Sequence, residues 1–101
     1  MVDEPLPFVS WSGPSTMAEV GRHRERLLEV LAEGRGARID LEASGPWDLA
    51  GLQLLLSALE SGRRSGRLVR LSGIPAVLRD LAIRGGHSHR LEAATDPSVD
   101  G

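Results

Sequence analysis

Histidines and hydroxyl residues are the side chains of this sequence that could do acid–base, nucleophilic or metal chemistry, because it contains no cysteine. His87 and His89 follow a Gly-Gly pair, but two imidazoles do not complete a metal coordination shell. His23 lies between two arginines, and we expect it to be solvated. No G-x-S-x-G nucleophile elbow and no placed acid–base pair occurs. The residues therefore predict no catalytic site, no metal site and no cofactor.

Positive charge is concentrated in one part of the chain. All 12 cationic side chains are arginine, and segment 61–90 holds seven of them against Asp80 alone, a local charge of +6 within a net charge of −2. A guanidinium group can grip carboxylate or phosphate with two hydrogen bonds, so one hypothesis is a small nucleotide-binding protein or enzyme using this segment. The other is a solvated surface. We expect no nucleic-acid binding, because aromatic residues for base stacking are only 3% of the chain.

The segment from Ser44 to Gly51 combines turn residues with a large aromatic side chain. Asp48 is placed to cap a helix that begins at Leu49, and Trp47 comes directly before it. Tryptophan is enriched in binding hot spots, so Trp47 could be an exposed contact for a partner. It could equally fold inward and plug the end of a sheet.

These residues must be positioned by an alternating series of strands and helices. Thr16 and Glu19 have the spacing of a capping box for a first helix, Gly34 is a natural C-cap for it, and Gly85-Gly86 would end a third helix. Short apolar runs predict strands, and apolar residues at helical spacing predict helices; the strands are expected at 8–11, 37–41, 67–71 and 91–94, and the helices begin near 15–16, 49 and 75. This alternation indicates an α/β fold with an at least partly parallel sheet.

The length of 101 residues suits one domain with one core. We expect residues 1–7 to be a mobile segment, residues 8–95 to form the domain and residues 96–101 to be a polar tail. The chain has no signal-like start and no run of 18 apolar residues. A cytoplasmic location without membrane insertion is therefore expected, and the absence of cysteine fits a reducing compartment.

Two stretches together resemble the STAS domain family, which includes the anti-sigma factor antagonists. The first is Ile39-Asp40-Leu41, a loop, and then Asp48-Leu49-Ala50-Gly51-Leu52-Gln53-Leu54-Leu55-Leu56. In the family a strand ending in Asp-Leu leads to a helix start of the type Asp-Ser-Ser-Gly-Leu or Asp-Thr-Ala-Gly-Leu. The second stretch, Gly66 to Leu81, is similar to the family's next strand and helix, and the resemblance covers about residues 8–86.

The resemblance implies a single STAS-like domain with a mixed sheet of four to five strands and helices packed on one face. It also implies a non-enzymatic binding module. Antagonists of this family bind a kinase-type anti-sigma factor and are released when a serine just before the motif glycine is phosphorylated. Here that position is Ala50 and the preceding one is Leu49, so neither has a hydroxyl, whereas Asp48 and Gly51 match the motif. Phosphorylation at the motif position is therefore not expected.

Our main hypothesis is a protein-binding regulator in a partner-switching or chemotaxis-type signalling circuit. Trp47 would be an aromatic anchor, Asp48 a cap and orienter, Leu49 and Ala50 apolar contacts, and Gly51 would allow close backbone approach. The partner would be a kinase-type anti-sigma factor or another signalling protein, and a homodimer is left open. The alternative within the family is the small STAS subunit that braces the ATPase of a phospholipid-trafficking ABC transporter.

Overall fold

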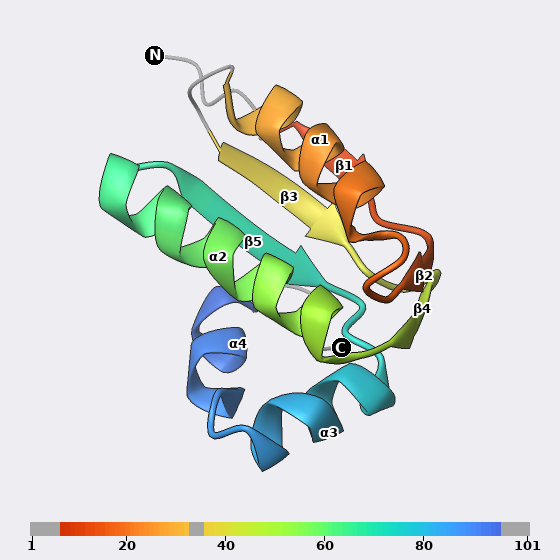
Figure 1. Ribbon diagram of the computed structural model, residues 1–101. Helices are drawn as coiled ribbons and strands as arrows, with labels where there is room; N and C mark the ends of the chain where they lie inside the picture. The colour runs from red at the N-terminus through yellow and green to blue at the C-terminus, as the bar shows by residue number, and fades with distance from the viewer. Residues whose placement is uncertain (1–6, 33–35, 96–101) are drawn as a thin grey trace.

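Nine elements follow one another in the part of the chain that the computed structural model describes, residues 7–32 and 36–95 (Figure 1). In chain order they are β1 (Phe8–Ser10), β2 (Gly13–Ser15), α1 (Val20–Leu31), β3 (Gly36–Asp40), β4 (Ser44–Trp47), α2 (Leu49–Ser65), β5 (Leu68–Ser72), α3 (Ala76–Arg84) and α4 (Ser88–Ala94). The expected α/β class is confirmed. Apart from Pro7, the segment expected to be mobile and the expected tail lie outside the described residues, as does the proposed C-cap at Gly34.

The five strands form two sheets, and every pairing between them is parallel. The larger sheet has the order β1-β3-β5, with Val9 opposite Ile39 and Ile39 opposite Leu71. The smaller sheet pairs β2 with β4. The number of strands matches the expectation, but they make two parallel sheets instead of one mixed sheet. Parallel neighbours need crossover connections, which α1 supplies between β1 and β3, and α2 between β3 and β5.

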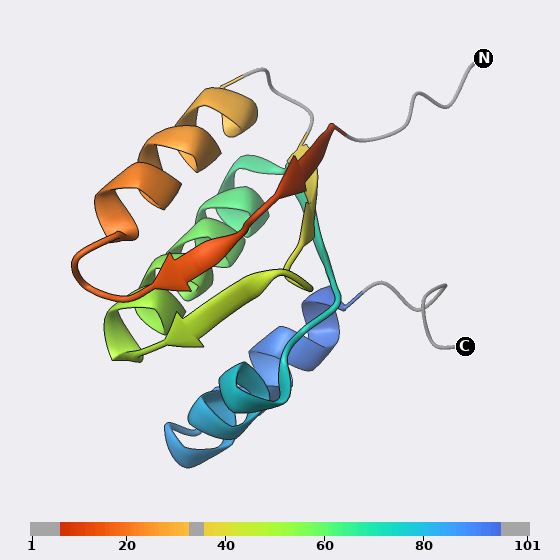
Figure 2. The same cartoon turned by 90° about the vertical axis from the view of Figure 1, so that its right-hand side faces the viewer.

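Helices cover one face of the larger sheet, as expected. Figure 2 shows α1 and α2 on the same side of β1, β3 and β5, while α3 and α4 lie beyond the β5 edge. Strand residues alternate accordingly, because successive side chains point to opposite faces. Val9, Ile39 and Leu71 are buried in the core beneath the helices, whereas Phe8 and Leu68 are exposed.

The first helix begins later than its sequence indicated. A turn precedes it, in which the amide of Glu19 donates to the carbonyl of Thr16 at 2.8 Å, and Glu19 makes no side-chain capping bond. The predicted capping box of Thr16 and Glu19 is therefore wrong. The physical reason is that β2 occupies the chain up to Ser15, so the backbone needs further residues to turn into α1.

The longest helix agrees with its sequence signals. Asp48 caps α2, and the helix ends at Gly66, whose φ of 75° is the left-handed conformation that glycine adopts without strain. Leu52, Leu55 and Leu56 are buried in the core. The predicted start of this helix is thus confirmed.

The chain after β5 is more helical than expected. Helix α3 ends before Gly85, as predicted, but residues 91–94 belong to α4 and do not form a strand. A helix places Leu91 and Ala94, three residues apart, on one buried face. Thr95, at the helix end, makes an isolated parallel bridge to Leu71, so among the described residues β5 has β3 as its one full strand partner.

Candidate functional site

The turn that starts α2, residues 47–51, is the site indicated by the sequence, and Asp48 organises it. Its Oδ1 accepts a hydrogen bond from the amide of Gly51 at 3.2 Å, and its Oδ2 accepts one from the amide of Met17 at 3.1 Å. Its own amide donates to the carbonyl of Ser15 at 3.4 Å. Asp48 therefore caps α2 and also holds the turn that leads into α1.

Both carboxylate oxygens of Asp48 are engaged by the chain itself. The hydrogen bond from the Met17 amide, together with that from the Gly51 amide, holds the pKa of Asp48 below its ordinary value. The residue is thus a carboxylate at neutral pH whose acceptor positions serve internal amides. Its predicted role as cap is confirmed, and this arrangement suits positioning better than acid–base chemistry.

Gly51 provides close packing within the protein. A Cβ atom at this position would overlap the carbonyl oxygen of Ser15 and would lie 2.9 Å from Cε3 of Trp47. Sequence reasoning expected Gly51 to admit close backbone approach at a contact site. The structure shows that the backbone approaching it is β2 of the same chain.

Trp47 faces inward, which decides between the two alternatives left open by the sequence. Only 7% of its surface is exposed. Its ring stacks on Trp11, with 5.2 Å between ring centroids, and its Nε1–H donates to Oγ of Ser44 at 2.8 Å. The hypothesis that Trp47 is an exposed anchor for a partner is therefore wrong, because the indole fills the space beneath the small β2–β4 sheet.

The aromatic stack continues to His23, which sequence reasoning had placed in solvent. His23 is 5% exposed, and its ring lies 4.6 Å from that of Trp11. Its Nε2 is 2.9 Å from the carbonyl oxygen of Pro14, so Nε2 carries the proton and donates it to this bond. Burial lowers the pKa of His23. The expectation of a solvated histidine is wrong, whereas the neighbouring arginines that suggested it are exposed.

Sequence reasoning missed this stack of Trp47, Trp11 and His23 as a unit. The signal that could have found it is the pair of short Gly-Pro segments next to the two tryptophans, Gly13-Pro14 and Gly45-Pro46. Glycine and proline are turn residues, so neither segment was predicted as a strand, whereas they form β2 and β4.

The accessible part of the site is apolar. Leu49 is 56% exposed on the first turn of α2, and Met17 is 74% exposed beside it, since its amide is bound to Asp48. Ala50 is half-buried. The structure thus brings together all five residues predicted from the sequence, but it presents Leu49 and Ala50, with Met17 added, as the surface. We call these three residues the Leu49 surface.

The other candidates from the sequence do not form a second chemical centre in the described part of the chain. No group of three or more histidine or acidic residues that could hold a metal ion is found there. Arg79 pairs with Glu92 at 2.6 Å and Arg84 with Asp80 at 2.8 Å, so part of the basic segment is used in ion pairs on the surface. None of the helices in residues 7–32 and 36–95 has the length and apolar character needed to cross a membrane.

Comparison with known proteins identifies the family. A protein-family model described as "Mlab, STAS domain" matches residues 7–92, and no curated protein matches. The fold is similar to the crystal structure of a sulfate transporter family protein from Wolinella succinogenes, with a TM-score of 0.71 and 22% identity over 93% of this chain and 80% of that one.

The fold is also similar to the STAS domain of the SulP transporter from Vibrio cholerae. That alignment has a TM-score of 0.66 and 17% identity over 96% of this chain and 77% of that one. The order of strands and helices and the capped start of α2 agree with the family resemblance of the Asp-Leu-Ala-Gly-Leu sequence at residues 48–52. Because the family model spans most of its length, this chain belongs to the STAS domain family.

Proposed function

We propose that this STAS domain is a non-enzymatic protein-binding module that docks a partner on the Leu49 surface. The observation that carries the proposal is the exposure of Leu49 and Met17 around a turn whose polar groups are already satisfied. When a partner removes exposed apolar side chains on a rigid helix start from water, the free energy of binding becomes more favourable. Asp48 would keep the two helix starts in place while the partner binds.

The absence of hydroxyl groups at positions 49 and 50 shapes the regulation that we propose. A phosphate at a helix start adds about −1.5 to −2 charges and would disrupt an apolar interface. With Leu49 and Ala50 this chain cannot carry that modification at those positions. Binding would therefore be controlled by partner concentration, as in a constitutive regulator of a cytoplasmic kinase-type anti-sigma factor or another signalling protein.

A second candidate function is the STAS subunit that braces the ATPase of a phospholipid-trafficking ABC transporter. What favours it is the family model, whose description names Mlab and not a sigma factor antagonist. In this case the Leu49 surface would dock on an ATPase. The same surface serves both candidates, so the identity of the partner distinguishes them.

The test is affinity purification of the tagged full chain from its native cell, followed by identification of the captured proteins. Leu49→Asp should reduce capture of the true partner by more than tenfold, because it buries a charge in an apolar contact. The matched control is Leu28→Asp, since Leu28 is 54% exposed on α1, away from the α2 turn. Equal capture by both variants would refute the proposal. A captured kinase would support the signalling role, and a captured transport ATPase the second candidate.

A further inference from the structure

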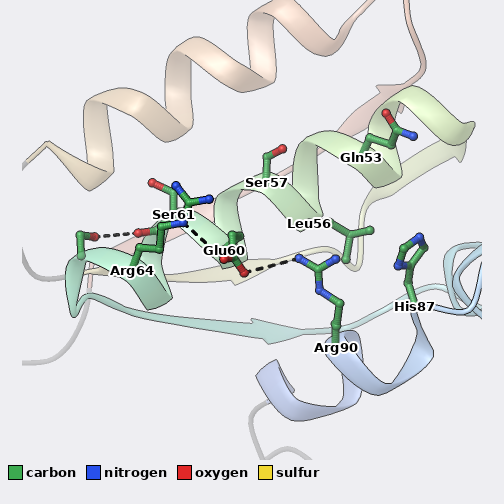
Figure 3. A pocket seen from close by; sticks show the side chains of 9 residues that line it. Gln53, Leu56, Ser57, Glu60, Ser61, Arg64, His87 and Arg90 are labelled. Atoms are coloured by element: carbon green, nitrogen blue, oxygen red, sulfur yellow. Dashed lines mark hydrogen bonds and ion pairs between the residues drawn. The ribbon is translucent and has the colours of Figure 1, made fainter.

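A second surface lies at the other end of α2, where its later turns face α4 (Figure 3). Two hollows open there and share the side chains of Glu60 and Arg90. The first runs between α2 and α4, and the second continues past Arg63 to the start of β5. We call the two hollows together the α2–α4 groove; the residues that characterise it are Leu56, Glu60, Arg63, Arg64, Arg67 and Arg90.

Three guanidinium groups from two helices converge on a single carboxylate in this groove. Arg63 Nη2 lies 2.7 Å from Oε2 of Glu60. Arg64 Nε lies 3.4 Å from the same oxygen, and Arg90 Nη2 lies 3.8 Å from Oε1 of Glu60 (Figure 3). The hydrogen bond from Arg63 is the main cause that lowers the pKa of Glu60. One carboxylate cannot neutralise three guanidinium groups, so positive charge remains in excess at the groove.

The excess extends into the second hollow. Arg67 and Arg70 line it as well, and Glu60 is the single acidic side chain among the described residues that line either hollow. The arrangement of Glu60 shows that these guanidinium groups can be directed at a carboxylate. A guanidinium binds such a group with planar, paired hydrogen bonds. The charge therefore fits a carboxylate-bearing ligand.

The floor of the groove is apolar, which narrows the kind of ligand further. Leu56 and Val69 are buried beneath it, and Leu59 is half-buried. No tryptophan, phenylalanine or tyrosine lines the described hollows, so stacking of nucleobases has no platform there. A membrane surface is flat and would meet the arginine rim without filling the groove. A segment that carries both apolar and acidic side chains matches floor and rim together.

We propose that the α2–α4 groove binds an acidic, amphipathic segment of a partner protein. Its apolar side chains would lie on Leu56 and Leu59, and its carboxylates would pair with Arg64 and Arg90 in competition with Glu60. The arginine end of the groove lies away from the Leu49 surface, because Arg64 follows Leu49 by fifteen helical residues, which correspond to about 22 Å.

The experiment titrates the ¹⁵N-labelled full chain with a synthetic 14-residue peptide that carries leucines on one helical face and glutamates on the other. The matched peptide has glutamine in place of each glutamate. We expect shift changes in the second half of α2, in α4 and at the start of β5, with affinity at least about tenfold lower for the glutamine peptide. Binding should also weaken as salt is raised from 0.05 to 0.5 M. Equal affinity for the two peptides would overturn the proposal.

Variants of the chain make the test specific for the groove. Arg64→Glu combined with Arg90→Glu should lower the affinity for the glutamate peptide by about tenfold or more. The control, Arg24→Glu combined with Arg26→Glu, changes net charge by the same amount on exposed positions of α1 and should leave affinity within about twofold. Equal losses in both double variants would show attraction by net charge alone. Tighter binding of single-stranded DNA or of phosphatidylglycerol vesicles to the same residues would also contradict an acidic protein segment as the ligand.

Discussion

The two ends of α2 present surfaces of opposite chemistry. At its N-terminal end the polar groups bind one another: Asp48 accepts from the amides of Met17 and Gly51, and the Trp47 indole donates to Ser44. The side chains exposed to solvent at this end, Leu49 and Met17, are apolar. Towards the C-terminal end, Glu60 cannot balance the arginines around it, and charge remains exposed above an apolar floor.

Substitutions at the two ends of α2 should therefore affect different properties, stability at one end and binding at the other. The residues beneath the Leu49 surface are buried and close-packed, so changing them should mainly lower the stability of the domain. The arginines of the α2–α4 groove extend into solvent, so changing them should alter binding and leave stability almost constant.

Trp47→Ala should cause the largest loss of stability. It removes a buried indole that stacks on Trp11 and fills the space under the small sheet. Substitution of a buried tryptophan by alanine costs about 3–5 kcal/mol, and urea unfolding followed by circular dichroism measures it. Trp47→Phe should recover part of the lost free energy of unfolding, because an aromatic ring is retained. If Trp47 were an exposed anchor, as the sequence allowed, the alanine variant would be as stable as the parent chain.

Gly51→Ala should be the next most harmful change, although it adds a single methyl group. The new Cβ would overlap the Ser15 carbonyl oxygen, which belongs to backbone and cannot rotate away. Overpacking of this kind costs about 1–3 kcal/mol. Gly21→Ala is the matched control, because nothing lies within 4 Å of its Cβ position inside α1, and it should stabilise by about 0.5–1 kcal/mol. Similar unfolding midpoints for the two variants would contradict the packing described.

The stability of the domain should fall as the pH is lowered through the titration of His23. Burial holds its pKa in the folded protein below the ordinary value of 6.5, so the unfolded chain takes up the proton at higher pH than the folded one. The contribution of neutral, buried His23 to the free energy of unfolding is therefore complete above pH 6.5. It is lost progressively below pH 6.5, down to the lowered pKa of the folded state. Urea midpoints measured from pH 8 to 5 would show this fall.

One variant separates His23 from other titrating groups. His23→Gln should flatten the part of the pH profile just below 6.5, because glutamine has no proton to take up in this range. A fall of the urea midpoint that persists unchanged in His23→Gln would show that the stack does not control this titration.

The elements of the larger sheet and α2 were predictable because their signals are local. Alternating apolar residues at 37–41, the cap at Asp48 and the leucines three and four residues apart each specify one structure. The strands β2 and β4 were missed because glycine and proline favour turns, and only the pairing of two distant segments makes them strands. The inward orientation of Trp47 and the burial of His23 were not predictable from local sequence either. Each depends on contact with Trp11, which lies at least twelve residues away in the chain.

Glu60→Gln should have the smallest effect on the fold and still sharpen the contrast between the two ends of α2. It removes the carboxylate that competes for Arg63, Arg64 and Arg90 while it keeps the size of the side chain. We expect tighter binding of the glutamate peptide by about twofold to fivefold, the range of exposed ion pairs, with an unchanged unfolding midpoint and no change in capture through the Leu49 surface. Fluorescence anisotropy of a labelled peptide measures the gain. Weaker binding by this variant would mean that Glu60 is needed to hold the arginines in place, and that the carboxylate positions the groove instead of competing for it.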